Sequence, residues 1–212
     1  MGQNIFEGKF ELLKRATFHA SNPTPLTGIA SKAAATSLEV TEGLMSIYNS
    51  ATANQGSIII PKRLKLTATT ANTSATALNL IGYLDSIERH SSGGSSITPV
   101  SLYKTSSSET LAASRAEIDF GLLTFAAASD ATLVFNQQIS EAVLAAEETL
   151  EILFVDPTQD AVIPGLANNQ IVVMAPVIGP GATLTIHDVA PSASADAEFE
   201  FEFDYVEYGL NR

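Results

Sequence analysis

The feature that most constrains the fold of this chain is a stretch near its C-terminal end in which acidic and aromatic residues alternate. It reads DAEFEFEFDY and spans residues 196–205. Successive side chains of a β-strand point to opposite faces, so an extended chain places the phenylalanines and Tyr205 on one face and the carboxylates on the other. The pattern predicts a strand over residues 195–208 whose rings are buried in a core or an interface.

The carboxylate face of this strand has three explanations at the level of sequence. It is a solvated outer face whose charges prevent pairing with copies of the same strand. Alternatively, it meets a basic strand, for which Arg63 and Lys65 have the matching period of two. The third explanation is a Ca²⁺ site, which would need several of the carboxylates to converge on one ion. The acids of this face are Asp196, Glu198, Glu200, Glu202 and Asp204.

Period-2 alternation recurs along the chain and predicts an all-β protein. In residues 57–70, Leu64 and Leu66 share one face and Arg63 and Lys65 share the other. Connectors rich in Ser, Thr and Gly at residues 69–76, 90–99, 104–114 and 177–183 are typical of turns. We expect an antiparallel β-sandwich of jelly-roll type with about ten strands. The expected strands are residues 43–48, 57–70, 75–87, 97–103, 116–125, 132–138, 150–155, 170–176, 183–189 and 195–208.

The first 42 residues differ from the rest of the chain in their residue pattern. Pro23 and Pro25 cannot belong to a central strand, so residues 1–42 are expected to form an extended N-terminal arm with the first strands, and residues 43–212 the sandwich domain. Phe6, Phe10 and Phe18 are apolar residues in this arm that need a partner surface. They are therefore the candidates for contacts with neighbouring subunits.

The charge of the chain is divided unevenly. The net charge is −12, but residues 1–115 carry ten Lys and Arg against seven acids, whereas residues 116–212 carry one Arg against sixteen acids. This division argues against a nucleic-acid partner, which would require a dense basic surface. It favours electrostatic pairing between the two halves, within one subunit or between neighbours. Arg63 and Lys65 are the expected basic side of this pairing.

Motifs for catalysis and for metal binding are weak. The chain has no Cys, so it offers neither disulfides nor thiolate ligands, and its three histidines have no metal-ligand spacing. His187-Asp188 could form part of a catalytic dyad, but no G-x-S-x-G motif supplies a serine nucleophile. Glu117 and Asp119 are candidates for a glycosidase carboxylate pair. The absence of Trp weakens that alternative, because sugar clefts commonly present flat aromatic platforms.

Several segments together resemble the small β-sandwich structural proteins of tailed-bacteriophage virions. They are an arm (FHASNPTPLTGIAS, residues 18–31), a short strand (GLMSIYNSA, 43–51), an apolar strand with basic residues (GSIIIPKRLKLTATT, 56–70) and a late hairpin (PVIGPGATLTIHD, 176–188). The resemblance lies in the residue composition and the order of these segments, and it covers most of the chain. It implies a jelly-roll-like sandwich, oligomeric placement on a particle and no catalytic residues.

These observations together give an expected function and its alternatives. We expect a non-enzymatic virion protein of the decoration or cement kind, which binds copies of itself and a major capsid protein and uses no cofactor, no nucleic acid and no membrane. Its expected contact residues are Phe6, Phe10, Phe18, Arg63, Lys65, Glu198, Glu200 and Glu202. The alternatives are a carbohydrate- or receptor-binding module of a phage fibre, with Ser- and Gly-rich loops as its contact surface, and a glycosidase-like enzyme.

Overall fold

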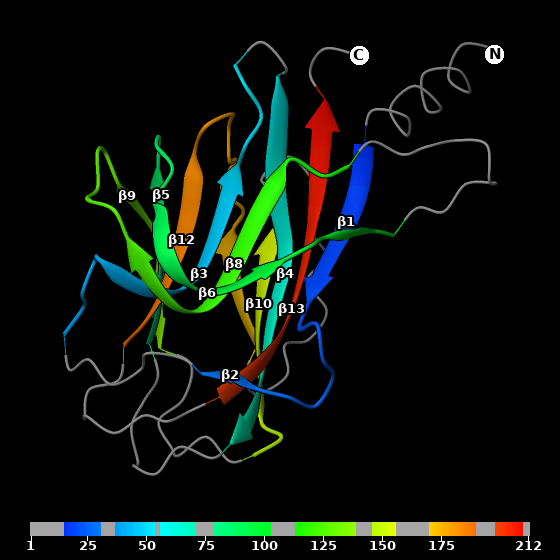
Figure 1. The fold of residues 1–212 in the computed structure, drawn as a ribbon, viewed down its shortest axis with the longest axis vertical. Coiled ribbons are helices and arrows are strands. Elements are labelled where there is room, and N and C mark those ends of the chain that lie inside the picture. Colours follow the sequence, from blue (N-terminus) through cyan, green and yellow to red (C-terminus); the bar gives the residue numbers. More distant parts are fainter. Residues whose placement is uncertain are drawn as a thin grey trace.

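The computed structural model describes residues 15–30, 37–53, 56–70, 79–102, 113–138, 146–155, 170–189 and 198–209. These residues form thirteen β-strands and no helix, and the strands build two sheets that face each other (Figure 1). The predicted all-β class is confirmed, and the two sheets are consistent with the predicted β-sandwich.

The first sheet, sheet A, has the strand order β11-β10-β4-β13-β1-β7, and β2 pairs with one end of β13. Its neighbouring strands are antiparallel except β10 and β11, which are parallel. Its strands are β1 (Arg15–Ser21), β2 (Ile29–Ala30), β4 (Ser57–Thr70), β7 (Val100–Ser101), β10 (Thr149–Val155), β11 (Gln170–Met174) and β13 (Glu198–Gly209).

The second sheet, sheet B, has the strand order β6-β8-β3-β12-β5-β9 and is antiparallel throughout. Consecutive strands often lie in opposite sheets, so the chain crosses between the sheets repeatedly. The strands of sheet B are β3 (Glu42–Asn49), β5 (Asn79–Asp85), β6 (His90–Ile97), β8 (Ala116–Phe125), β9 (Thr132–Gln138) and β12 (Thr183–Val189).

The C-terminal strand β13 lies in the middle of sheet A, between β4 and β1 (Figure 1, red). The predicted burial of its aromatic face is confirmed: Phe199, Phe201, Phe203 and Tyr205 are each at most 1% exposed. Phe201 stacks on Phe120 of sheet B with ring centroids 4.2 Å apart. Burying each ring contributes on the order of 1.5–3 kcal/mol, so this strand is a principal anchor of the two-sheet core.

Several expected strands agree with the structure in their bounds, among them residues 57–70, 116–125, 132–138 and 183–189. In β4, Leu64 and Leu66 are buried in the core as predicted. Pro61 lies inside this strand next to an irregularity, because Asp204 pairs with Arg63 whereas Tyr205 pairs with Pro61. A bulge is a position at which a sheet tolerates proline, which has no N–H to donate.

The expectation of a turn over residues 90–99 is wrong, since residues 90–97 form β6 at the edge of sheet B. Gly93 and Gly94 have φ of 85° and 68°, and the pairing of β6 with β8 is shifted between Gly93 and Ser95. Glycine adopts such backbone angles without strain. Over this shift β8 spans three residues, from Phe120 to Leu123, so the extra residue lies in β8. Strand β6 was missed because residues 91–96 are all Ser or Gly and show no apolar alternation. The strand expected over residues 97–103 is interrupted at Pro99, where the chain leaves sheet B for β7 of sheet A.

The N-terminal region is not a separate arm over residues 15–30. Strand β1 lies inside sheet A, where its residues pair with β13 along its whole length. Phe18 is 3% exposed and stacks on Tyr205 at 5.4 Å, so its side chain belongs to the core of its own subunit. The boundary expected at residue 42 therefore does not separate β1 from the sandwich. Phe6 and Phe10 lie outside the described residues.

The stacked pair Phe120–Phe201 leads to a stability prediction. Replacing Phe201 by Ala should lower the free energy of unfolding by about 3–5 kcal/mol, because a large cavity opens between the two sheets. Urea unfolding of both proteins measures this loss. Val100→Ala is the control: Val100 is 63% exposed, so its effect should stay within about 0.5 kcal/mol. Equal effects of the two substitutions would contradict the assignment of β13 as the anchor.

Candidate functional site

The outer face of sheet A carries the acidic row of β13, and half of this row is neutralised within the subunit. Arg63, on the neighbouring strand β4, donates from Nε to Asp204 and from Nη2 to Glu202, each over 2.8 Å. Its Nη1 lies 3.6 Å from Glu151 of β10, on the other side of β4. A single arginine thus bridges two acidic strands, since cross-strand neighbours on one face of a sheet come within contact range.

Two further basic groups complete this network. Lys65 donates to Glu202 over 2.8 Å, and His19 of β1 lies 2.7 Å from Asp204. The hydrogen bond from Lys65 is the main reason why the pKa of Glu202 is held below its usual value. For Glu202 and Asp204, the structure therefore confirms the explanation in which the acids meet a basic strand.

The other half of the acidic row has different partners. Glu200 accepts a hydrogen bond from the backbone N–H of Leu26, and Glu198 accepts one from Thr70 Oγ1 over 3.4 Å. Among the described residues, neither carboxylate has a basic side chain within ion-pair distance. Within the described part of the chain, the row is thus divided into Glu202 and Asp204, which pair with basic side chains, and Glu198 and Glu200, which do not.

A groove of about 630 Å³ lies over the junction between the two halves. It has the size of a typical ligand pocket. Its floor includes Glu200 and Glu202 of β13 and Lys65 and Thr67 of β4, and the loop between β1 and β2 provides one wall with Pro25 and Leu26. The groove combines charged, hydroxyl and apolar groups.

A metal site on this face is not supported by the geometry. Within the described ranges, no three His, Asp or Glu side chains come together in a way that could hold a metal ion. The Ca²⁺ explanation of the acidic row requires several carboxylate oxygens at 2.3–2.6 Å from one ion. Side chains on one face of a strand are instead spaced by about 6.6–6.8 Å, which spreads the charges apart.

A second polar cluster lies on the side of sheet B and is fully buried. The guanidinium of Arg89 contacts Asp85 at 3.1 Å, and the two side chains are 2% and 0% exposed. Arg89 also donates to the carbonyl groups of Ala126 and Val40. Burial favours a raised pKa for Asp85, but hydrogen bonds from the backbone of Ser129 and Asp130 and from Arg89 outweigh it and lower the pKa. This cluster fastens the segment before β3, the segment between β5 and β6 and the segment between β8 and β9 to one another.

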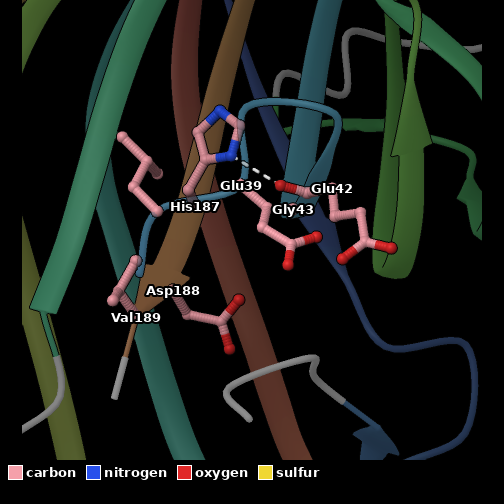
Figure 2. A pocket seen from close by; sticks show the side chains of 7 residues that line it. Glu39, Glu42, Gly43, His187, Asp188 and Val189 are labelled. Atoms are coloured by element: carbon pink, nitrogen blue, oxygen red, sulfur yellow. Dashed lines mark hydrogen bonds between the residues drawn. The ribbon is translucent and has the colours of Figure 1, made fainter. Parts of the chain in front are cut away.

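His187 stands near this cluster and does not form the catalytic dyad considered from the sequence. Its ring is hydrogen-bonded through Nδ1 to the carbonyl of Glu42 at 2.6 Å and through Nε2 to Thr185 Oγ1 at 3.0 Å. Since a carbonyl can only accept, Nδ1 carries the proton. Figure 2 shows the ring turned away from the carboxylate of Asp188, as expected for adjacent residues of a strand. The cavity beside it has about 10 Å³, the size of one water molecule.

His90, Asp119 and Ser96 also come together, but in an order that does not activate a serine. The carboxylate of Asp119 lies between the other two, accepting from Ser96 Oγ and contacting His90 Nδ1 at 3.1 Å. In a catalytic triad the histidine stands between the serine and the acid. The second ring nitrogen of His90 contacts the carbonyl of Gly93. Neither Glu117 nor Asp119 lines the groove or the cavity beside His187.

The contact residues expected from the sequence are distributed as follows. Arg63, Lys65 and Glu202 meet in one network, Glu198 and Glu200 lie next to it, and Phe18 is on the opposite, inner face of sheet A. Sequence reasoning missed Arg89, because it lies in the loop after β5, where a four-residue spacing from Asp85 predicts no contact. It also missed Leu26, because the sequence pattern around this residue contains no signal for its position.

Comparison of the chain with protein-family models, with curated proteins and with solved structures finds no match. None of the described segments is a helix that is long and apolar enough to cross a membrane. Functional inference for this protein therefore depends on the geometry of its own residues.

The position of His187 predicts how stability depends on pH. Burial, followed by the nearby charge of Arg89, lowers the pKa of His187 from 6.5 to about 4. The unfolded chain binds a proton at a higher pH than the folded chain, so stability is fully present above pH 6.5 and falls as the pH is lowered toward 4. This loss amounts to about 3 kcal/mol. In His187→Gln, the unfolding free energy measured with urea should depend less steeply on pH in this window, by about 1.4 kcal/mol per pH unit. An unchanged slope would contradict the buried neutral imidazole.

The Lys65–Glu202 pair predicts a second pH effect, at lower pH. Because the pKa of Glu202 is lowered in the folded state, its contribution to stability is present above pH 4.5 and is lost as the pH falls below that value. Lys65→Met should remove much of this contribution, about 1 kcal/mol at neutral pH for a partly exposed pair. The difference in unfolding free energy between the two proteins should shrink toward pH 3. A difference that stays constant with pH would assign the effect to packing of the lysine stem.

Proposed function

We propose that the sandwich has jelly-roll topology. Eight of its strands form four nested pairs, namely β1 with β13, β3 with β12, β4 with β10 and β5 with β9. Each pair is antiparallel, so together they make one long ribbon that starts at the two chain ends and turns between β5 and β9. The orders β1-β13-β4-β10 and β3-β12-β5-β9 are those of a ribbon rolled into two sheets. Strands β6, β7 and β8 are then an insertion at the tip of the ribbon.

We infer from this topology that the chain is a non-enzymatic structural protein of a virion, of the auxiliary capsid kind. The nested pairing is the observation that carries the proposal, since jelly rolls of this kind are common in viral capsid domains. Fold alone does not specify function. The resemblance of the sequence to small sandwich proteins of tailed phages is the second support. The expected partners are other copies of the chain and a major capsid protein.

Exposed apolar side chains at both edges of sheet A support association between copies. Val100 and Leu102, on and beside β7, are 63% and 58% exposed, and Met174 and Val177, at the other edge, are 58% and 51% exposed. An edge strand offers unpaired backbone groups as well as side chains. Apolar residues gathered at such an edge are typical of surfaces that bind another chain.

A second candidate function is recognition of a carbohydrate or a receptor. The observation in its favour is β6, which exposes six consecutive residues from Ser91 to Ser96 at the edge of sheet B. Four of them are serines, whose hydroxyls suit polyhydroxylated ligands. Reproducible binding on a glycan array that is lost when the four serines become alanines would favour this candidate over the structural role.

The structural role predicts where the protein is found. In tailed-phage particles produced from a genome that encodes this chain, many copies should be present on the outside of the head, which mass spectrometry and cryo-electron microscopy of purified particles can detect. Particles that lack the chain should release their DNA at a lower temperature, and adding back the purified protein should restore the original release temperature. The matched variant is Val100→Asp/Leu102→Asp, and adding it back should restore the release temperature less completely. Absence of the chain from purified particles would contradict the proposal.

A further inference from the structure

One wall of the groove on sheet A is a loop held in a single conformation. Asn22 clamps it to β13: its side chain accepts from the N–H of Phe201 over 2.7 Å and donates to the carbonyl groups of Thr27 at 2.8 Å and Phe199 at 3.4 Å. Gly28 closes the loop, since a Cβ there would lie 2.5 Å from that of Glu198. The loop therefore cannot fold away from the groove without breaking these bonds.

Leu26 stands at the tip of this loop in an unusual state. It is 88% exposed and has a φ of 64°, a backbone conformation that residues other than Gly, Asn and Asp rarely adopt. Its N–H is bound by the carboxylate of Glu200, which helps to hold this conformation. A backbone strained in this way persists where its surroundings fix it, and such positions concentrate at binding sites. The loop thus presents an apolar side chain beside the groove.

The charge around the groove specifies the kind of ligand. Lys65 also lines it, but its charge is taken up by Glu202. Glu200 in the groove and Glu198 beside it have no basic partner among the described side chains. They lie two residues apart on one strand, with a spacing of about 6.6–6.8 Å. An extended peptide has the same spacing between its alternate side chains, so two cations of such a peptide can reach both carboxylates.

We propose that this groove binds an extended segment of a different protein in which Lys or Arg occupies alternate positions. The cationic groups lie on Glu198 and Glu200, and the aliphatic stems of the same side chains cover Leu26. The charge disfavours a second copy of this chain as the occupant, because each copy carries a net charge of −12. The inference rests on the proposed function only in taking the partner to be a protein of the particle.

Binding of a defined peptide to the purified full chain tests this inference. The probe is acetyl-Lys-Thr-Lys-Thr-Lys-Thr-Lys-amide with a fluorescent label, and its anisotropy is measured at low salt. The same peptide with Glu in place of Lys is the ligand control. The wild-type protein should bind the lysine peptide and not the glutamate peptide, and Glu198→Gln/Glu200→Gln should weaken binding at least fivefold.

The matched control removes two charges elsewhere. Glu88 and Glu117 are exposed acids on the sheet B side, so Glu88→Gln/Glu117→Gln loses the same net charge outside the groove. It should change peptide binding by less than twofold. Equal weakening by both double variants would overturn the inference, because binding would then follow net charge alone. Failure of the wild-type protein to bind the lysine peptide would overturn it as well.

The apolar wall is tested separately. Leu26→Asn keeps a residue that tolerates positive φ and removes the aliphatic surface. It should weaken peptide binding two- to fivefold with an unchanged thermal midpoint, whereas Leu122→Asn on sheet B, where Leu122 is 48% exposed, should not. Self-association that disappears in Glu198→Gln/Glu200→Gln would overturn the inference in favour of a second copy. Peptide binding is measured without phage particles. A protein that does not bind the peptide but is found on the phage head would therefore contradict this inference and leave the proposed function in place.

Discussion

The burial of one aromatic row is the interaction on which the rest of this structure depends. Strand β13 places Phe199, Phe201, Phe203 and Tyr205 on the inner face of sheet A, each at most 1% exposed. Phe201 stacks on Phe120 of the opposite sheet. Since the burial of each ring contributes on the order of 1.5–3 kcal/mol, this row fixes the distance between the sheets and the direction in which β13 faces. The neighbouring strands β1 and β4 are positioned by pairing with it.

The same alternation that buries the rings forces the carboxylates onto the outer face, where the protein uses them in two ways. Glu202 and Asp204 are neutralised by Arg63, Lys65 and His19 from the two flanking strands. Glu198 and Glu200 form no ion pair with these three groups and lie next to a hydrogen-bonded loop that exposes Leu26. A single strand therefore contributes both to a network of ion pairs and to the groove beside it. The core and the proposed binding surface are two faces of one element.

Strands whose apolar and polar residues alternate over most of their length could be predicted from the sequence, although several of them contain a bulge. Strands β8, β9 and β12 agree with their expected bounds, and the facing of Leu64, Leu66, Arg63 and Lys65 in β4 was correct. Strand β6 was not predicted, because its exposed residues 91–96 are all Ser or Gly, so no apolar alternation marks it. Residues 15–21 were expected to lie within the N-terminal arm of residues 1–42, since Pro23 and Pro25 follow them closely. The prolines instead lie in the loop after the strand, so they do not interrupt its pairing with β13.

The sequence by itself determined that β13 is a two-sided strand and that basic residues of matching period exist for its acids, because both facts follow from the period of two of an extended chain. It could not determine which acids those bases would meet, because the alignment of β13 on β4 depends on the bulge at Pro61 and on the packing of rings between sheets. Only the tertiary structure separated Glu202 and Asp204 from Glu198 and Glu200. It also brought Leu26 to the edge of the groove, since that position is fixed by hydrogen bonds to residues more than 170 positions away along the chain.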